Sequence, residues 1–201
     1  MTGVLTDKES RLLVDRFTGA WNGLNGKSYV VQSPAAARTA IRAIASARSV
    51  TAAVAWADPL LAELDLAPLF ASYHSPANLT DGAAFRAACA QAGVGITTAE
   101  LAMADTGTLL LPYGPQWPRS VSVLPPTWIT VFPAERLVAG RSDLFRHLAE
   151  RARGGRLPAE MGLLTGPSST GDIENISQQG AHGPGDVYAV ILLRRPAIPQ
   201  S

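Results

Sequence analysis

The chain has 201 residues, of which 47% are hydrophobic, and its formal net charge is +1. This length fits one domain, and the hydrophobic content supplies a sizeable core and excludes a disordered chain. The near-zero charge gives no field that would attract a polyanion or an anionic lipid surface, so we expect neither nucleic acid nor a membrane as a partner. The first residues are polar and charged, and no apolar run reaches about 18 residues, which predicts a cytoplasmic protein.

The first third of the chain alternates helical and strand-like patterns. Helices are predicted over residues 6–21, 33–47 and 58–64, and strands over 29–31 and 50–56. Ser33-Pro34 and Asp58-Pro59 are typical of helix starts, because the first residue caps the helix and proline fits its first turn. This alternation is typical of a parallel α/β sheet.

The middle of the chain changes to short apolar runs after a helix predicted over residues 80–93. The runs cover residues 94–97, 101–104, 108–111, 120–124 and 128–132. Prolines and glycines separate them, so we expect successive strands that form a meander or mixed sheet inserted into the α/β frame.

Cysteine occurs once, at Cys89, within the helix predicted over residues 80–93. One thiol forms no internal disulfide and cannot supply the three or four thiolates of an iron–sulfur cluster or a structural zinc site. We expect a buried, small hydrophobic side chain; the alternative is a reactive nucleophile. The three histidines have no spacing typical of a metal site, so we expect the chain itself to bind no metal or cofactor.

The last third begins with a helix predicted over residues 142–153, capped by Ser142 and packed through Leu144, Phe145 and Leu148, with His147 on its outer side. Buried strands are predicted over 161–165 and 187–193. Between them lies a glycine-rich connection with a short polar helix that begins near Asp172. No repeat or linker is present, so we expect one domain over residues 1–201, with an N-terminal helix within 1–22 and a flexible tail at 194–201.

The glycine-rich connection carries the strongest functional pattern. Ligands of open α/β sheets bind at the carboxyl ends of strands, where loops present backbone N–H groups. Thr165, Ser168 and Thr170 add hydroxyl groups there, and Gly166 permits a close approach of the backbone to a ligand. The alternative is a well-capped turn that binds nothing, and the spacing alone does not decide between them.

One nucleotide-binding motif is nearly present in this connection. Gly166 and Gly171 have the G-x-x-x-x-G spacing of a P-loop, which continues with lysine and then serine or threonine. Here Asp172 and Ile173 follow instead. The charge is opposite to the one needed and the hydroxyl is missing, so nucleotide hydrolysis is excluded.

Two blocks resemble the LUD-domain family of lactate-utilization proteins. The first block comprises Thr165-Gly166-Pro167-Ser168, Thr170, Asp172-Ile173-Glu174 and His182-Gly183-Pro184. The second comprises residues 104–108, Arg119-Ser120 and Leu124-Pro125. Together they span residues 104–193, nearly half the chain. Trp128 stands where the family often has histidine, and Asp105 replaces the commoner glutamate, which indicates a diverged member.

The resemblance implies candidate catalytic residues at Asp105 and His182. It implies ligand contacts at Thr106, Gly107, Arg119, Gly166, Pro167, Ser168, Thr170, Asp172, Glu174, Gly183 and Pro184. Structural alternatives exist: Asp105 can accept backbone N–H groups within its own turn, and His182 can hold its loop by a hydrogen bond. Arg119 can clamp a carboxylate or phosphate, or be an ordinary surface residue.

The sequence Asp105-Thr106-Gly107 also occurs in aspartic proteases. Those enzymes need two carboxylates that share a proton, and this chain has one copy of the motif. A protease would therefore require a symmetric dimer, and we disfavour this interpretation.

The resemblance implies a fold similar to the NagB/RpiA/CoA-transferase group, with a parallel-rich mixed sheet, helices on both faces and a β-rich insertion. It also implies a role in oxidising L-lactate to pyruvate, beside partner proteins that carry iron–sulfur clusters. We therefore expect a non-redox accessory component that binds a small anionic metabolite. The alternatives are a stand-alone enzyme acting on a phosphorylated, carboxylated or CoA-linked metabolite, and a structural interaction domain.

Overall fold

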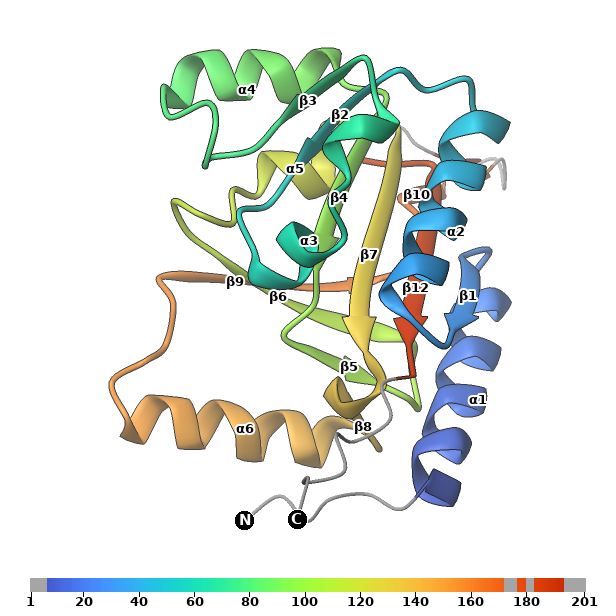
Figure 1. The fold of residues 1–201 in the computed structure, drawn as a ribbon. Helices are drawn as coiled ribbons and strands as arrows, with labels where there is room; N and C mark the ends of the chain where they lie inside the picture. The colour runs from blue at the N-terminus through green and yellow to red at the C-terminus, as the bar shows by residue number, and fades with distance from the viewer. Residues whose placement is uncertain (1–6, 172–176, 180–182, 194–201) are drawn as a thin grey trace, which may run out of the picture.

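The computed structural model describes residues 7–171, 177–179 and 183–193, and its centre is a sheet of six parallel strands (Figure 1). The strands are β1 (Lys27–Val31), β2 (Ala52–Ala55), β3 (Ser72–His74), β4 (Val94–Thr98), β7 (Thr127–Pro133) and β12 (Asp186–Leu192). Their order across the sheet is β1-β12-β7-β4-β2-β3. The two central strands, β12 and β7, pair along their whole length from Asp186↔Thr127 to Leu192↔Pro133. Both are buried, as expected for parallel strands covered on two faces.

A second, smaller sheet has the strand order β8-β5-β6-β9. These strands are β5 (Leu101–Met103), β6 (Thr108–Tyr113), β8 (Leu137–Val138) and β9 (Glu160–Thr165). β5 and β8 are parallel, and the other pairings are antiparallel. A further antiparallel pair joins β10 (Ser169–Gly171) to β11 (Ser177–Gln179). The expected fold class, α/β with a parallel sheet and a β-rich insertion, is confirmed.

The helices are α1 (Asp7–Gly23), α2 (Pro34–Ala47), α3 (Pro59–Glu63), α4 (Gly82–Gln91), α5 (Ser120–Val123) and α6 (Arg141–Arg153), with short 3-10 helices η1 (Ala67–Leu69) and η2 (Ala134–Arg136). Helices α2 and α3 begin at the caps that the sequence predicts. The side chains of Ser33, Asp58 and Asp81 each accept a hydrogen bond from a backbone N–H in the first turn of α2, α3 and α4. Among the described residues, no helix combines the length and apolar character needed to cross a bilayer.

Aromatic side chains join helix α1 to the parallel sheet. Phe17 contacts Phe132 with ring centroids 5.5 Å apart, and Trp21 contacts Trp128 at 6.3 Å. All four side chains are buried, and buried aromatic pairs of this kind add to the free energy gained from apolar burial alone. A smaller apolar group lies between α6 and the second sheet, built from Leu101, Met103, Leu110 and Leu144.

The meander or mixed sheet expected over residues 94–132 is confirmed in part. β5 and β6 belong to the mixed second sheet, whereas β4 and β7 belong to the parallel sheet. The strand expected over residues 120–124 is wrong, because this segment contains helix α5 (Ser120–Val123). Gly95 of β4 explains this packing, because a Cβ there would overlap the backbone carbonyl of Val121. The missing side chain lets the backbone of α5 lie directly on the sheet, which no local apolar pattern reveals.

Three expectations about the last third were also wrong. Helix α6 is capped at Gly140 and not at Ser142, and Phe145 is 65% exposed instead of packed inward. Strand β9 is not buried: it pairs only with β6 among the described strands, and its side chains at Met161 and Leu163 are 36% and 56% exposed. The apolar pattern of β9 matches a buried strand, but its place at a sheet edge depends on contacts far away in the sequence.

Some predicted features lie outside the described residues. The polar helix was expected to begin near Asp172, which is outside them, and Ser177–Gln179 is strand β11 instead of helix. The tail expected over residues 194–201 is also outside them. His74 is the last residue of β3, where its Nε2 lies 3.1 Å from the Ser72 hydroxyl.

Candidate functional site

Two of the blocks singled out in the sequence meet where β6 begins and β9 ends. Thr108 of β6 pairs in register with Thr165 of β9. The hydroxyl groups of Thr106 and Thr108 are 2.8 Å apart, and those of Thr108 and Thr165 are 2.7 Å apart. The chain of three hydroxyl groups therefore connects the turn at 105–108 to the turn that begins at Gly166.

The turn at Gly183-Pro184 lies next to the turn that begins at Gly166. Ser168 donates its backbone N–H to the carbonyl of Pro184 at 3.0 Å. A Cβ on Gly183 would lie 3.3 Å from the Cβ of Ser168, so the two turns are in contact. We call residues 105–108, 165–168 and 183–184 the turn cluster. It unites most of the predicted site residues: Asp105, Thr106, Gly107, Gly166, Pro167, Ser168, Gly183 and Pro184.

Arg119 does not belong to the turn cluster. Its guanidinium pairs with Glu160 at 2.8 Å, and Glu160 pairs with Tyr113 at the opposite end of the β6–β9 ladder. That end is five residue steps along the strand from Thr108, which corresponds to about 17 Å. One small ligand would not bridge that span, so Arg119 and the turn cluster are separate locations.

The remaining predicted residues divide into two groups. Thr170 lies in strand β10, next to the turn cluster in sequence. Asp172, Glu174 and His182 lie outside the described residues.

Two of the three glycines of the turn cluster, Gly107 and Gly166, are explained by packing. Gly107 and Gly166 have φ angles of 64° and 74°, which favour glycine. A Cβ on Gly107 would lie 2.9 Å from the backbone nitrogen of Trp21, and one on Gly166 would lie 3.1 Å from the Cβ of Leu24. The turns therefore need glycine in order to lie against the end of α1 and the residues that follow it, whether or not a ligand binds there.

Asp105, the charged residue of the turn cluster, lies next to the start of helix α6. Asp105 is exposed, and its carboxylate lies against Gly140, where any Cβ would overlap it. Gly140 is the residue that caps α6. Asp105 therefore lies where the turn cluster meets the start of helix α6. Among the described residues, no ion pair brings a cation to the turn cluster.

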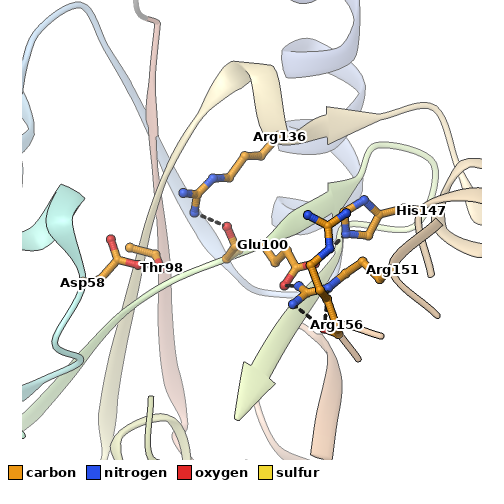
Figure 2. Close-up of polar contacts among 8 residues, drawn as sticks. Asp58, Thr98, Glu100, Arg136, His147, Arg151 and Arg156 are labelled. Carbon is orange, nitrogen blue, oxygen red and sulfur yellow. Dashed lines mark hydrogen bonds and ion pairs between the residues drawn. The ribbon is translucent and has the colours of Figure 1, made fainter. Parts of the chain in front are cut away.

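A second polar group occupies the carboxyl ends of β2 and β4 (Figure 2). β2 and β4 are neighbours in the parallel sheet. The next strand of that sheet after β2 is β3, on one side of the pair, and the next after β4 is β7, on the other side. The carboxyl ends of β2 and β4 therefore form a topological switch point. Such points are common ligand sites in open α/β sheets. Asp58, after β2, accepts the hydroxyl of Thr98 at 3.0 Å and the backbone N–H of Leu60 at 2.9 Å.

Glu100, two residues after Thr98, is the centre of a second set of polar contacts at this edge (Figure 2). Its carboxylate lies 2.5 Å from Nε2 of His147 and accepts a hydrogen bond from Arg151, both on helix α6. Its side chain is only 17% exposed. Burial raises the pKa of Glu100, but the hydrogen bonds and positive charge from Arg151 and His147 outweigh burial and leave the pKa below its usual value. The ionised carboxylate therefore anchors α6 to the end of β4.

Arginine side chains extend the same group. Arg136 donates to the carbonyl of Ala99 at 2.5 Å, which connects η2 to the end of β4. Arg151 also donates to the carbonyl of Arg156 through Nε and Nη2, at 3.0 and 2.8 Å. We call Asp58, Thr98, Glu100, Arg136, His147 and Arg151 the carboxyl-edge cluster.

The sequence interpretation missed the carboxyl-edge cluster and placed His147 on the outer side of its helix. That placement was wrong, because the ring contacts Glu100. His147 and Arg151 are four residues apart, a spacing that places both on one face of α6 and was visible in the sequence. Nothing local indicated Glu100 as their partner, since it lies 47 residues before His147.

Comparison with known proteins decides the family. A family model described as the LUD domain matches residues 14–192. The chain belongs to the LUD-domain family. Lactate utilization protein C from Halalkalibacterium halodurans is 35% identical over 141 residues, which are 69% of this chain and 60% of that protein. The protein of that name from Bacillus subtilis is 39% identical over 97 residues, 47% of this chain and 40% of that protein. The LUD-domain chain thus spans about half the length of the curated relatives it matches.

A solved structure has the same fold. The crystal structure of a DUF162 family protein from Deinococcus radiodurans aligns with a TM-score of 0.65 at 18% sequence identity. The alignment covers 94% of this LUD-domain chain and 99% of that one. The overall fold is therefore shared with a protein of very different sequence.

Two residues discussed in the sequence have buried side chains in the LUD domain. Trp128, at the position where the family often has histidine, is 1% exposed and donates its indole N–H to Thr97 at 2.9 Å, so it packs in the core. Cys89 is fully buried and donates its thiol to Ser120 at 3.4 Å, and burial raises its pKa. Both observations favour packing over chemistry at these positions. No group of three or more potential metal ligands occurs within the described residues.

Proposed function

We propose that this LUD domain is a non-redox accessory component of a cytoplasmic system that oxidises L-lactate to pyruvate. The observation that carries the proposal is the 35% identity over 141 residues to a protein named Lactate utilization protein C. In this role the domain binds a small anionic metabolite and acts beside partner proteins that carry the iron–sulfur clusters.

The cysteine content of the chain supports the assignment of electron transfer to partner proteins. Oxidation of lactate requires an electron acceptor, and a typical iron–sulfur cluster requires several cysteine thiolates. The sequence has one cysteine, Cys89, which is buried and bonded to Ser120. This chain cannot hold such a cluster with its own cysteines, so the proposal assigns electron transfer to the partners.

One observation favours a second candidate function, a stand-alone enzyme acting on a phosphorylated, carboxylated or CoA-linked metabolite. Asp58 and Thr98 lie at the switch point of the parallel sheet, where enzymes of this architecture often bind substrates. That argument is one of fold analogy, whereas the first proposal has sequence similarity extending through most of the chain.

The two candidates separate in a combined genetic and biochemical test. We expect deletion of the gene to prevent growth on L-lactate as the sole carbon source, and the tagged full chain to co-purify with proteins that contain iron and acid-labile sulfide. The isolated chain should show no turnover. Normal growth of the deletion strain, with no iron-containing partner, would contradict the accessory role, and turnover by the isolated chain would favour the enzyme.

A further inference from the structure

A cavity of about 300 Å³ lies between helix α4, the connection that leads to it from β3, and the segment 114–120 that leads into α5. Helices α4 and α5 lie next to each other on this side of the molecule (Figure 1). The volume is at the lower end of the range for small-molecule sites, about 300 to 1,000 Å³, and fits a metabolite of a few heavy atoms. The cavity is separate from both the turn cluster and the carboxyl-edge cluster, with which it shares no residue.

The walls of the cavity are apolar, with one cationic side chain. Leu79, Phe85 and Pro118 provide hydrocarbon surface, and Arg86 lines the cavity from α4. Arg86 also borders the shallow hollow on the outer side of α4, so it lies where the cavity meets the surface. A carboxylate at the cavity mouth can therefore meet the guanidinium while its hydrocarbon part contacts the apolar wall.

Arg86 differs from the arginines of the sites described above. Arg119 and Arg151 are paired with Glu160 and Glu100. Arg86 makes no ion pair with any other residue in the part of the chain that the structure describes. A guanidinium binds carboxylates through two parallel hydrogen bonds, so an uncommitted arginine beside an apolar cavity is suited to a small carboxylate.

Two hydroxyl groups complete the lining. Ser120 accepts the thiol hydrogen of Cys89 at 3.4 Å, which leaves its own O–H as a donor, and Thr80 also lines the cavity. The first turn of α4 is not an anion site, because the Asp81 carboxylate already accepts the backbone N–H of Ala84 at 2.7 Å. Recognition of a negative group here therefore depends on Arg86.

We propose that this cavity binds a short 2-hydroxy or 2-oxo carboxylate, with the carboxylate on Arg86, the adjacent oxygen near Ser120 or Thr80, and the hydrocarbon end against Phe85 and Leu79. The choice of this ligand class rests on the proposed function, which it deepens by placing the small anionic metabolite in the cavity. The cavity wall is attached to the parallel sheet, because Trp56 donates its indole N–H to the carbonyl of Pro118 at 3.0 Å. Binding should therefore change tryptophan fluorescence.

This inference is tested by titrating the full chain with L-lactate and with pyruvate, and measuring binding by calorimetry and by tryptophan fluorescence. We expect dissociation constants on the order of 1 mM, as for very small ligands. Arg86→Gln should weaken binding at least about tenfold, since a charged, bidentate hydrogen bond is lost. The matched control is Arg42→Gln, which removes an exposed arginine from helix α2 and should leave the affinity unchanged.

Three outcomes would overturn the inference. These are equal affinities in wild type and Arg86→Gln, binding of inorganic phosphate without binding of either carboxylate, and loss of binding in Ser168→Ala but not in Arg86→Gln. The growth test of the deletion strain and this binding test can fail independently of each other. Arg86-dependent carboxylate binding together with normal growth of the deletion strain would support the cavity and contradict the lactate role.

Discussion

The turn cluster and the carboxyl-edge cluster both connect the parallel sheet region to the second sheet and α6, and they do so by different physical means. In the turn cluster, close backbone approach decides which residues fit: Gly107 lies against Trp21 and Gly166 against Leu24. In the carboxyl-edge cluster, charge decides, because Glu100 is held by His147 and Arg151. A glycine-rich motif can thus mark a packing requirement, whereas a charged group with no visible motif can fix the position of a helix.

The largest expected effect comes from adding a single methyl group to the turn cluster. Gly107→Ala places a Cβ 2.9 Å from the backbone of Trp21 on a residue with φ of 64°. Conformational strain and steric overlap together should lower the free energy of unfolding by about 3 kcal/mol, measured by urea denaturation.

Gly155→Ala separates the two causes. Gly155 has nearly the same φ, 61°, but a Cβ there would meet nothing within 4 Å. Strain alone should cost about 1 kcal/mol. Equal losses in the two variants would show that the contact between the turn cluster and α1 does not require glycine.

A smaller effect is expected from neutralising the centre of the carboxyl-edge cluster. Glu100→Gln removes a carboxylate that accepts hydrogen bonds from His147 and Arg151, and it should lower the free energy of unfolding by about 2 kcal/mol. Its control is Glu160→Gln, which removes the partner of Arg119 in an exposed pair and should cost less than about 0.5 kcal/mol. Similar losses in both would mean that burial adds nothing to the Glu100 contacts.

The smallest expected effect is a difference in acid sensitivity. The pKa of Glu100 in the folded protein is below its usual value of 4.5, so the unfolded chain takes up a proton at Glu100 more readily. The stability that Glu100 contributes is fully present above about pH 5 and is lost as the pH falls through the folded pKa. Urea midpoints measured from pH 7 down to about pH 3 should therefore converge for wild type and Glu100→Gln. A gap that stays constant over this range would contradict the lowered pKa.

The sequence predicted best where the evidence was local. Ser33 and Asp58 mark their helix starts by residue type and position, and the structure has both as caps. The turn cluster was assembled from motif blocks, and Thr108 and Thr165 do lie side by side. By contrast, residues 120–124 have the composition of a strand but form helix α5, because tertiary packing on Gly95 outweighs a short apolar pattern.

By itself, the sequence determined the α/β class, the caps of α2 and α3, the family resemblance and the burial of Cys89, since each depends on neighbouring residues or on composition. Tertiary structure decided the rest. It placed Glu160, the partner of Arg119, about 17 Å along the ladder from Thr108, and it turned His147 inward to Glu100. It also left Arg86 beside a cavity without an ion pair to any residue that the structure describes. These facts depend on contacts between residues tens of positions apart, and the free energy of such contacts is set by how the sheets and helices pack, which no local pattern records.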